Sequence, residues 1–386
     1  MDFALTSEQR MIVESVRAFV EQEIYPYEDE VELRDEVRPE LRRQIVDRAK
    51  SQGFYAVNMP EKYGGGGLDH LSLMLFSREM GRASMALQWI VARPSQILQA
   101  CKDDQIDRYL IPTIEGKRVD CLALTEPESG SDLRSMRTRA ARDGEGYVIN
   151  GQKHFITNGT VADYIILFAS TGSEETSRGS KKKITCFLVD ADTPGVDVRR
   201  GPACVSHRGL HQAEIFFTDA RVEARQILGE EHRGFDVANE WLGATRLEVA
   251  AMCVGRAQRA LELCAEWCVT RKQFGQSIGK FQGVSFKLAD MAARIKAAEL
   301  LTFEAAWKAD NGAMTDMDAA IAKLQATEML AFVTDEAVQI FGGMGLMNSM
   351  PIERMWRDAR VERIWDGTSE IQRHIISRAL LRPLEH

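Results

Sequence analysis

The sequence predicts a mainly α-helical protein with a β domain at its centre. Apolar residues recur at helical spacing from Thr6 to about Gly116, and the same spacing returns after about Gly229 and continues to the end. Between these segments lie short runs rich in β-branched and aromatic residues, which are typical of strands. We therefore expect an N-terminal α-helical domain, a β domain and a C-terminal α-helical bundle, at residues 1–118, 119–230 and 231–386.

Length and charge set broad limits on function. A chain of 386 residues can form two or three domains, and 49 Lys and Arg against 57 Asp and Glu give a net charge of −8. Because no basic block is present, we do not expect the chain to bind nucleic acid. The first residues show no basic segment followed by an apolar core, and no apolar run is long enough to cross a bilayer. We expect a cytoplasmic protein without a membrane partner.

The cysteines and histidines predict neither a disulfide framework nor a metal site. Seven cysteines are an odd number in a long chain. Cys264 and Cys268 are one helical turn apart, but no matching Cys or His pair follows them. His207 and His211 stand in an irregular, glycine-containing stretch, so we expect no metal there.

Local signals define the helices of the first domain. Thr6 followed by Gln9 predicts a capping box at the start of a helix. A second helix is expected over Leu41–Ser51, and a third at about His70–Arg82. The four glycines at residues 64–67 lie between them and predict a tight turn.

The middle of the chain carries the strand signals. Asn150-Gly151 predicts a hairpin turn between the runs Tyr147–Ile149 and Lys153–Ile156. The polar segment Thr171–Lys183 is expected to form an exposed hairpin loop. Further strands are expected at Tyr164–Ala169, Ile184–Val189 and Glu214–Phe217.

The last part of the chain predicts long helices that pack against one another. Helical periods run over residues 242–271, 281–311, 315–341 and 351–364, and a last helix covers Ile371–Leu381. Helices of this length, joined by short connections, are typical of an antiparallel bundle.

The most informative short segment precedes that last helix. Asp366 stands between Trp365 and a Gly367-Thr368-Ser369 turn. Gly367 allows a positive φ, and Thr368 or Ser369 can cap the helix, with Glu370 in its first turn. A carboxylate beside Trp365 would be partly desolvated, which raises its pKa towards the range of a general base. The alternative is an ordinary helix start whose acid complements the helix dipole.

A second candidate element lies where the helical pattern gives way to strands. Small, hydroxylated and glycine residues cluster over 122–132, where backbone N–H groups can face a ligand and Thr125 and Ser131 can donate from their side chains. Phe155-Ile156-Thr157 would add an aromatic face and a hydroxyl beside this loop. Each segment alone fits a plain turn equally well. No G-x-G-x-x-G follows a strand, and residues 275–280 lack the full phosphate-binding loop pattern.

Five motifs, in order over essentially the whole chain, resemble those of the acyl-CoA dehydrogenases. That family has N-terminal helices, a β-barrel-like middle domain and a C-terminal four-helix bundle, which agrees with the predicted order. The matching segments are Leu124-Thr125-Glu126-Pro127-x-Ser129-Gly130-Ser131-Asp132, Phe155-Ile156-Thr157-Asn158-Gly159, Arg271-Lys272-Gln273-Phe274-Gly275, Gln339-Ile340-Phe341-Gly342-Gly343-Met344-Gly345 and Asp366-Gly367-Thr368-Ser369-Glu370-Ile371-Gln372-Arg373.

The resemblance implies a bound FAD and an acyl-CoA substrate, in a homotetramer or homodimer. One group of residues would bind the isoalloxazine side, with Thr125 near the pyrimidine edge and Thr157 near N5. A second group would reach the FAD of a neighbouring subunit or its adenine half, and a third would touch the phosphates or ribityl chain. The first group is Leu122, Leu124, Thr125, Gly130, Ser131, Phe155, Ile156 and Thr157. The second group is Arg271, Gln273, Phe274, Phe281, Gln282, Gln339, Ile340, Gly342 and Gly343. The third group is Thr368, Ser369 and Glu370.

The same resemblance implies substrate contacts from Ser131, Arg246, Gly367 and Arg93. Arg246 suits a phosphate, because a guanidinium forms forked, charge-assisted hydrogen bonds. Its alternative is an ion pair on the helix surface with Glu248 or Glu240. Arg93 falls on the helix that lines the acyl pocket in this family, and its alternative is a side chain that extends to the surface.

In the family reaction, a carboxylate removes the pro-R α-proton while the flavin accepts a hydride from the β-carbon, and electrons pass to electron-transfer flavoprotein. The thioester carbonyl is polarised by the ribityl 2′-hydroxyl and by the backbone N–H of the base residue. The expected base, Asp366, departs from the usual Glu, and Thr245 occupies the other known base position. Either the substrate sits closer, as a cyclic or substituted acyl group would, or the reaction is a relative's, or Glu248 is the base. We favour the first, because cyclic acyl-CoA dehydrogenases with Asp at this place exist in the family. Glu248 is disfavoured, because its side chain is expected to face another side of the helix.

Other functions remain open at this point. A flavin oxidase of the nitroalkane-oxidase type also uses Asp here, but retention of Arg246 and Ser131 counts against it. Some relatives act as enoyl-CoA reductases. A non-enzymatic flavoprotein that binds partners or DNA disagrees with the acidic charge. Trp89 and Trp365 would shorten the acyl pocket, so a short, branched or cyclic acyl group is favoured.

Overall fold

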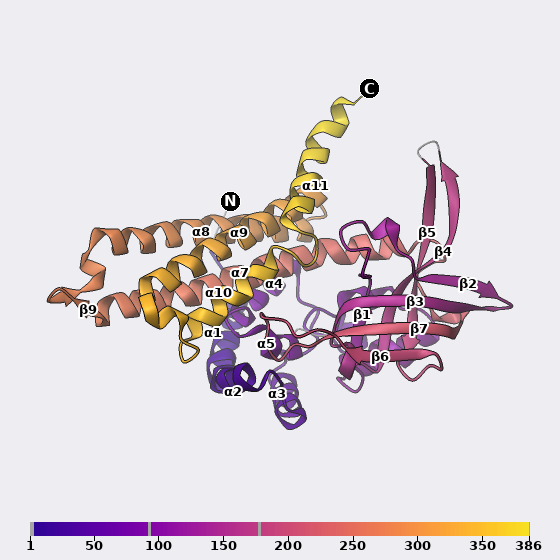
Figure 1. Cartoon of the computed structure of the whole chain (residues 1–386), viewed down its shortest axis with the longest axis horizontal. Helices are drawn as coiled ribbons and strands as arrows, with labels where there is room; N and C mark the ends of the chain where they lie inside the picture. Colours follow the sequence, from indigo (N-terminus) through magenta and orange to yellow (C-terminus); the bar gives the residue numbers. More distant parts are fainter. Residues whose placement is uncertain (1–3, 92–93, 177–178, 386) are drawn as a thin grey trace.

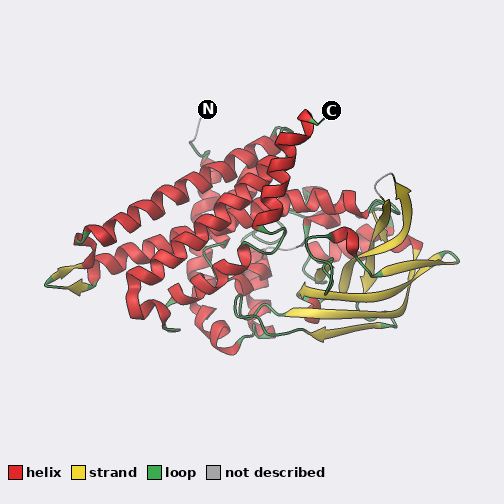
Figure 2. Ribbon diagram, turned by 45° about the horizontal axis from the view of Figure 1, so that its top comes forward, coloured by secondary structure: helices red, strands yellow, loops and turns green. Residues whose placement is uncertain are grey.

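The computed structural model describes residues 4–91, 94–176 and 179–385, and it confirms the predicted fold class. Helices occupy one end of an elongated molecule and strands the other (Figure 2). At the first helix, the Thr6 side chain accepts the Gln9 N–H and the Gln9 side chain accepts the Thr6 N–H, each at 3.1 Å, so the capping box forms as predicted. The helices before the sheet are α1 Ser7–Phe19, α2 Glu28–Arg34, α3 Pro39–Ser51, α4 His70–Met80, α5 Met85–Val91 and α6 Ile111–Ile114.

The central strands form one curled sheet in the order β6-β7-β3-β2-β4-β5-β8, and β1 pairs alongside β4. The pairings β1 with β4 and β2 with β4 are parallel and the others are antiparallel. The strands are β1 Asp120–Ala123, β2 Arg139–Asp143, β3 Gly146–Thr157, β4 Tyr164–Thr176, β5 Gly179–Asp190, β6 Val196–Arg200, β7 Gln212–Glu223 and β8 Ile227–Leu228.

The first part of β4, Tyr164–Ala169, is buried on both faces, which explains its unbroken apolar run. Ile166 and Phe168 pack against the N-terminal segment, in the cluster that holds Leu98 and Tyr109. The alternate residues, among them Leu167, pack inside the curl of the sheet. The sheet is therefore fastened to the helical part through one face.

The predicted hairpin turn at Asn150-Gly151 is wrong. Both residues lie inside the continuous strand β3, and the chain reverses at Gly144-Glu145, between Asp143 of β2 and Gly146 of β3. A Cβ on Gly151 would lie 2.5 Å from the Thr138 side chain, so this glycine permits close approach within the sheet rather than a turn.

The polar segment Thr171–Lys183 does form a hairpin, but its strands extend further than expected. Strands β4 and β5 remain paired from Gly172 with Lys183 to Thr176 with Gly179. Residues 177 and 178 at the tip lie outside the described chain.

The helices after the sheet form the predicted bundle, with short connections between α7, α8 and α9 (Figure 1). Helix α11 projects away from the bundle, and a small β9–β10 hairpin forms the opposite tip. Within the described residues, no helix is long and apolar enough to cross a membrane. The elements are α7 Gly234–Thr270, β9 Lys272–Gln273, β10 Gln276–Ser277, α8 Gln282–Asp310, α9 Asp316–Phe341, α10 Pro351–Glu362 and α11 Ser369–Leu381.

The N-terminal helices and the bundle share one hydrophobic core, in which Phe19 and Phe76 lie in the same cluster as Val254. Helices α4 and α7 cross in direct backbone contact. A Cβ on Gly255 of α7 would lie only 1.7 Å from the Arg78 carbonyl oxygen of α4. This crossing fixes α7, the helix that carries Arg246 and Glu248, against the N-terminal segment.

Replacing Gly255 with Ala will lower the thermal midpoint of unfolding, because the methyl group forces the two helices apart at a cost of about 1–3 kcal/mol. The control is Gly283→Ala in α8, where an added Cβ meets nothing within 4 Å. That variant will match or slightly exceed the wild type, since Ala favours a helix over Gly by about 0.5–1 kcal/mol. Circular dichroism melts of the three proteins measure this, and equal midpoints would contradict the close crossing.

Candidate active site

The backbone between α10 and α11 bends sharply at Asp366. Asp366 has φ of 50° and Gly367 has φ of 91°, so two consecutive residues adopt left-handed conformations. The positive φ of Gly367 agrees with the sequence, but that of Asp366 was not foreseen. A non-glycine residue in this region carries strain, and such strain is concentrated at functional sites. Thr368 caps α11, since its hydroxyl accepts the Ile371 N–H at 3.2 Å.

Lys323 of α9 holds this bend in place. Its buried ammonium donates to the carbonyl oxygen of Trp365 and, at 2.6 Å, to that of Gly367. The Gln372 side chain donates to the same Gly367 oxygen at 2.8 Å. The carbonyl groups of the residues before and after Asp366 are thus held by side chains from α9 and α11.

Asp366 is partly buried, and its carboxyl group makes no hydrogen bond or ion pair with any described residue. Burial raises the pKa of Asp366, and the Glu362 carboxylate adds to the rise against the opposing charges of Lys323 and Arg246. The raised pKa agrees with the desolvation that the sequence predicts for this acid, while its role as a general base stays a prediction.

Arg246 of α7 lies near this acid and is only 8% exposed. Its Nη1 is 3.8 Å from Asp316 Oδ1, a long contact with an exposed carboxylate. No ion pair joins Arg246 to Glu248 among the described side chains, and the side chain of Glu240, the other alternative, lies outside the described part. The Nε of Arg246 is buried and has no hydrogen-bond partner among the described residues. Burial lowers the pKa of Arg246, although Asp316 and Asp366 oppose this. A buried guanidinium with a free donor fits an anionic or carbonyl ligand.

An aromatic wall stands beside the acid. The Trp365 ring lies 6.0 Å from Trp89 and 5.1 Å from His207, between ring centroids. Its indole N–H donates to Glu362 at 2.7 Å, and Glu362 in turn accepts from Arg256 at 2.8 Å.

Sequence analysis missed the groups that orient Trp365. Burial alone would raise the pKa of Glu362, but Arg256 and His207 hold it below its usual range, so Glu362 stays ionised. Only the spacing of Glu362 three residues before Trp365 offered a signal. Arg256 lies far away in the sequence.

Glu248 of α7 is partly buried and forms no hydrogen bond or ion pair with another described residue. Burial, and after it the charge of Asp366, raises the pKa of Glu248 to about 7. That its side chain faces another side of the helix stays a prediction.

A second candidate element is the loop at residues 124–131. Glu126 and Ser129 exchange backbone hydrogen bonds of 2.9 and 3.1 Å, and the Ser129 hydroxyl donates to the Asp132 carbonyl at 2.7 Å. The His154 N–H donates to the Thr125 carbonyl at 2.9 Å, so the strand that leads to Phe155 lies beside this loop, as expected.

A buried ion pair between Lys153 and Glu126, which was not predicted from the sequence, stabilises this loop. Lys153 is fully buried and donates to Glu126 at 2.9 Å and to the Leu124 carbonyl at 3.0 Å. The Glu126 carboxylate also accepts the N–H groups of Arg137 and Thr138. Burial lowers the pKa of Lys153 to about 8, although Glu126 opposes this.

The surface formed by the loop and β3 fits a flat heterocycle. Phe155 adopts φ of 57° and is 61% exposed, an unusual state for a large apolar side chain. Gly130 is exposed and a Cβ there would meet no atom within 4 Å, so the loop backbone is accessible. Ile156 is buried, and the Thr157 hydroxyl donates to Gln212 at 3.1 Å. That these residues bind FAD stays a prediction.

The remaining expected FAD residues lie elsewhere in the chain. Ser369 and Glu370 begin α11, where the Ser369 hydroxyl donates to Glu328 at 2.7 Å. Phe274 is 93% exposed on the β9–β10 hairpin, at the tip of the bundle remote from the sheet (Figure 1). The end of α9 lies at the same tip, because Trp267 at the end of α7 stacks on Phe341 with 4.8 Å between ring centroids. The other expected residues near the hairpin and at the end of α9 therefore lie there too: Arg271, Gln273, Phe281, Gln282, Gln339, Ile340, Gly342 and Gly343.

Within a single chain, Asp366, Arg246 and Trp365 therefore lie near one another. The β9–β10 hairpin lies far from the loop at residues 124–131 (Figure 1). Leu122 belongs to β1, while Ser131 is exposed in the loop. Arg93 lies outside the described residues. Within those residues, no group of three or more His, Cys, Asp or Glu is placed to hold a metal ion.

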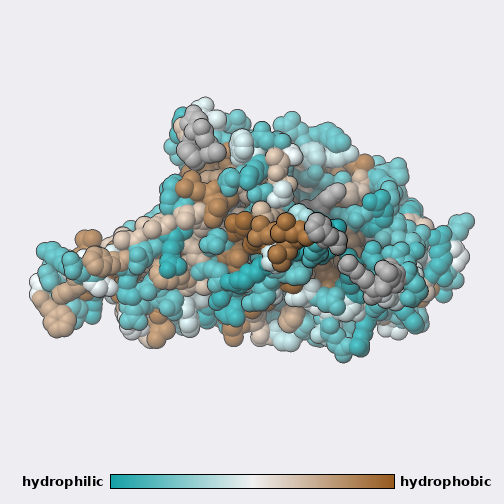
Figure 3. Space-filling model, turned by 90° about the horizontal axis from the view of Figure 1, so that it is seen from above, coloured by the Kyte–Doolittle hydropathy of each residue, from teal (hydrophilic) through white to brown (hydrophobic). Residues whose placement is uncertain are grey.

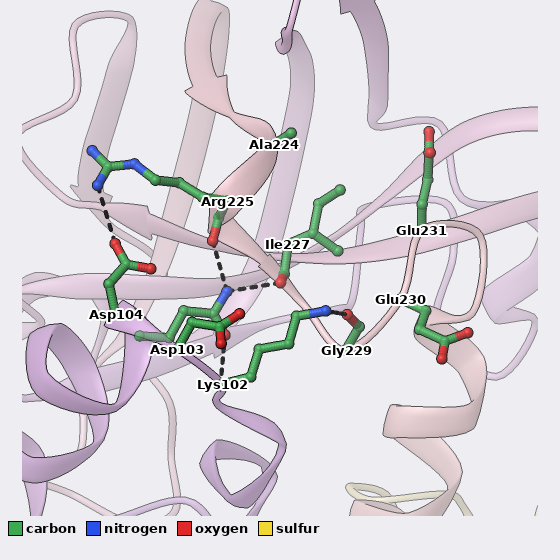
Figure 4. Close-up of a pocket in the computed structure, with 10 residues that line it drawn as sticks. Lys102, Asp103, Asp104, Ala224, Arg225, Ile227, Gly229, Glu230 and Glu231 are labelled. Carbon is green, nitrogen blue, oxygen red and sulfur yellow. Dashed lines mark hydrogen bonds and ion pairs between the residues drawn. The ribbon is translucent and has the colours of Figure 1, made fainter.

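A surface pocket near β8 does not contain any of these candidates (Figure 4). Its polar groups bond to one another: Lys102 donates to the Gly229 carbonyl at 2.9 Å, and Arg225 to Asp104 at 3.0 Å. We therefore assign it no part in the site.

Comparison with known proteins identifies the family. The chain matches the N-terminal, middle and C-terminal domains of acyl-CoA dehydrogenases at residues 6–117, 121–220 and 232–381. It is 37% identical to 3-(aryl)acrylate reductase of Clostridium sporogenes, over 98% of this chain and 99% of that protein. It is 35% identical to subunit CarC of the caffeyl-CoA reductase–Etf complex of Acetobacterium woodii, over 98% and 99% of the two chains.

A solved structure agrees with these matches. The butyryl-CoA dehydrogenase of Megasphaera elsdenii superposes with a TM-score of 0.90 at 36% identity, covering 99% of this chain and 100% of the other. The fold, the motifs and the relatives all lead to one conclusion: this chain belongs to the acyl-CoA dehydrogenase family, whose members depend on FAD.

Proposed function

We propose that the chain catalyses α,β-dehydrogenation of an acyl-CoA thioester, with Asp366 as the base. The observation that carries this proposal is the Asp366 carboxyl, which has a raised pKa, pairs with no other described residue and lies in a strained bend fixed by Lys323. A structural acid at a helix start would be expected to be solvated or paired instead.

The geometry around Asp366 suits proton abstraction from the carbon next to a thioester. The backbone N–H of Asp366 donates no hydrogen bond to any described residue, so it remains available to polarise the thioester oxygen. The Asp366 carboxylate takes the α-proton as the α C–H bond breaks. The chemistry that bound FAD supplies is acceptance of the hydride from the β-carbon.

We assign FAD binding to the loop and β3 residues around Phe155, the start of α11, and the hairpin residues of a neighbouring subunit. Large apolar side chains exposed on the bundle support an oligomer, a homotetramer or homodimer, and apolar atoms also gather on the face shown in Figure 3. The exposed apolar side chains of the bundle include Phe274, Phe286, Leu300, Trp307, Leu380 and Leu381.

For the substrate, we assign Arg246, Ser131 and Gly367 to the CoA thioester or its nucleotide, and Arg93 to the acyl pocket. A short, branched or cyclic acyl group is favoured, because the side chain of Asp366 is one methylene shorter than Glu and Trp89 and Trp365 pack together beside it. Electron-transfer flavoprotein is the proposed electron acceptor, supported by the relative that is a subunit of a reductase–Etf complex. We also propose that the protein is located in the cytoplasm.

Two relatives are named as reductases, which favours the enoyl-CoA reductase direction as a second candidate function. A nitroalkane-oxidase-type reaction is less well supported, because the buried Arg246 with a free donor suits a larger anionic or carbonyl ligand such as a CoA thioester.

Replacing Asp366 with Asn will leave FAD and acyl-CoA binding intact but slow flavin reduction by about 10²–10⁴-fold, the usual contribution of a general base. The measurement is anaerobic stopped-flow bleaching with a panel of short, branched, cyclic and dicarboxylic acyl-CoAs. Asp290→Asn, an exposed acid on α8, is the control and will bleach normally. Normal bleaching by Asp366→Asn would refute the base assignment.

Replacing Lys323 with Met will remove the two carbonyl contacts while a similar volume stays buried. We expect flavin reduction to slow by on the order of a hundredfold, because displacing a base by about 1 Å has this effect, while FAD content stays unchanged. Lys296→Met, an exposed lysine on α8, serves as the control. If both variants reduce flavin at the wild-type rate, Lys323 does not position the base.

Replacing Phe274 with Ser tests the contribution of a second subunit. We expect the dissociation constant for FAD to rise by at least about tenfold, since aromatic anchors dominate such contacts, with no change in the melting curve of the helices. Leu33→Ser, exposed on α2, is the control. FAD retention equal to wild type after gel filtration would count against a shared flavin site.

A further inference from the structure

The loop at residues 124–131 is held by an ion pair that the proposed reaction does not use. The side chains of Lys153 and Glu126 are 0% and 4% exposed, and their charged atoms are 2.9 Å apart. Removing two charges from water costs about as much free energy as their attraction returns, so such a pair adds little to stability by itself. Its consequence lies in the parts of the chain that it holds together.

The Glu126 carboxylate closes the loop on itself. One oxygen accepts the Arg137 N–H at 2.5 Å, and the other accepts the Thr138 N–H at 2.9 Å. Lys153 of β3 donates to that second oxygen at 2.9 Å and to the Leu124 carbonyl at 3.0 Å. The residues on both sides of the loop and strand β3 therefore meet at one carboxylate.

The middle of the loop remains open. Gly130 and Ser131 are exposed, and their backbone N–H groups donate no hydrogen bond to any residue in the described part of the chain. Directly before them, Ser129 is buried and exchanges two backbone hydrogen bonds with Glu126. Two free donors thus lie on a loop whose ends are fixed, which suits a ligand with acceptor atoms.

Lys153 also lies at the point where β3 turns Phe155 outward. Residues two apart in a regular strand share one face, yet Lys153 is buried and Phe155 is 61% exposed. The reason is a bulge, because the pairing of β3 with β7 shifts register between Lys153 and Ile156, and Phe155 has φ of 57°. His154, inside the bulge, donates its N–H to the Thr125 carbonyl at 2.9 Å. The loop and the bulge are therefore joined at two neighbouring residues of β3.

We propose that Glu126 and Lys153 form a positioning pair for FAD, which holds the free N–H groups of Gly130 and Ser131 in a fixed relation to the exposed ring of Phe155. A site that is formed before its ligand arrives binds more tightly, because less of the chain must be ordered on binding. Both side chains act through the backbone that they fix. The inference rests on the proposed function, which assigns FAD to this loop and to Phe155.

The test compares affinity for FAD with the stability of the fold. Each full-length variant is freed of FAD and titrated with FAD by fluorescence quenching, and its thermal midpoint of unfolding is measured. Glu126→Gln keeps the side-chain volume but has one acceptor atom instead of two, and Lys153→Met removes the ammonium. We expect each variant to raise the dissociation constant for FAD by at least about tenfold.

The double variant Glu126→Gln/Lys153→Met separates positioning from stability. Each single substitution leaves the other residue buried without its partner, whereas the double variant removes both charges, so its thermal midpoint will return towards that of the wild type. Its dissociation constant for FAD will stay raised by at least about tenfold, because the loop is no longer closed on β3. Hydrogen–deuterium exchange at residues 126–138 of the FAD-free protein, followed by mass spectrometry, will also be faster than in the wild type. Wild-type affinity and exchange in the double variant would overturn the inference.

Arg118→Met is the matched control. Arg118 donates to Asp190 at 2.7 Å in another partly buried ion pair of the same domain. It precedes β1, whereas the loop follows the end of that strand. This variant will lower the thermal midpoint and keep the wild-type dissociation constant for FAD. An equal loss of FAD affinity in Arg118→Met would show that the effect reflects stability alone, and would contradict a positioning role.

Phe155→Ser separates this inference from the proposed function, because it changes the ring expected to contact the flavin. If Phe155→Ser weakens FAD binding but the Glu126 and Lys153 variants do not, the pair has no positioning role, while the assignment of FAD to this surface stands. If none of these variants weakens FAD binding, the assignment of FAD to the loop fails, and the inference fails with it.

Discussion

The contact on which the site depends is the bond of Lys323 to the backbone on both sides of Asp366. The bend contains two left-handed residues, one of them an aspartate, and such a bend persists only when its surroundings hold it. The ammonium from α9 provides that constraint, because it ties the Trp365 and Gly367 carbonyls to a helix that packs against α7 and α10. The positive charge of Lys323 also opposes the rise in the pKa of Asp366 that burial causes. Lys323 therefore acts both on the position of Asp366 and on its ionisation.

The acids around this bend differ in their partners. Glu362 pairs with Arg256 and accepts the Trp365 indole N–H with its second oxygen. Neither Asp366 nor Glu248 forms a hydrogen bond or ion pair with another residue of the described ranges, and burial raises the pKa of both carboxyls. Raised carboxyl pKa values of this kind are typical of sites where a proton is taken up.

The sequence predicts the parts of the fold and site that depend on local chemistry. Helix spacing, the Thr6 capping box, the turn at Gly367 and the cap at Thr368 all follow from short-range rules. The predicted hairpin at Asn150-Gly151 is wrong because this glycine allows two strands to approach closely, while the turn lies at Gly144-Glu145. Lys323, Arg256 and Lys153 were not predicted because their partners lie 42, 106 and 27 residues away.

The most direct test measures removal of the α-proton separately from flavin reduction. The holoenzyme is incubated in D₂O with a short saturated acyl-CoA, and deuterium at the α-carbon of recovered acyl-CoA is measured by mass spectrometry. If Asp366 is the base, the wild type will take up deuterium and Asp366→Asn, with its FAD in place, will take up none. Equal uptake by the two proteins would contradict this assignment, because another group would then be removing the proton.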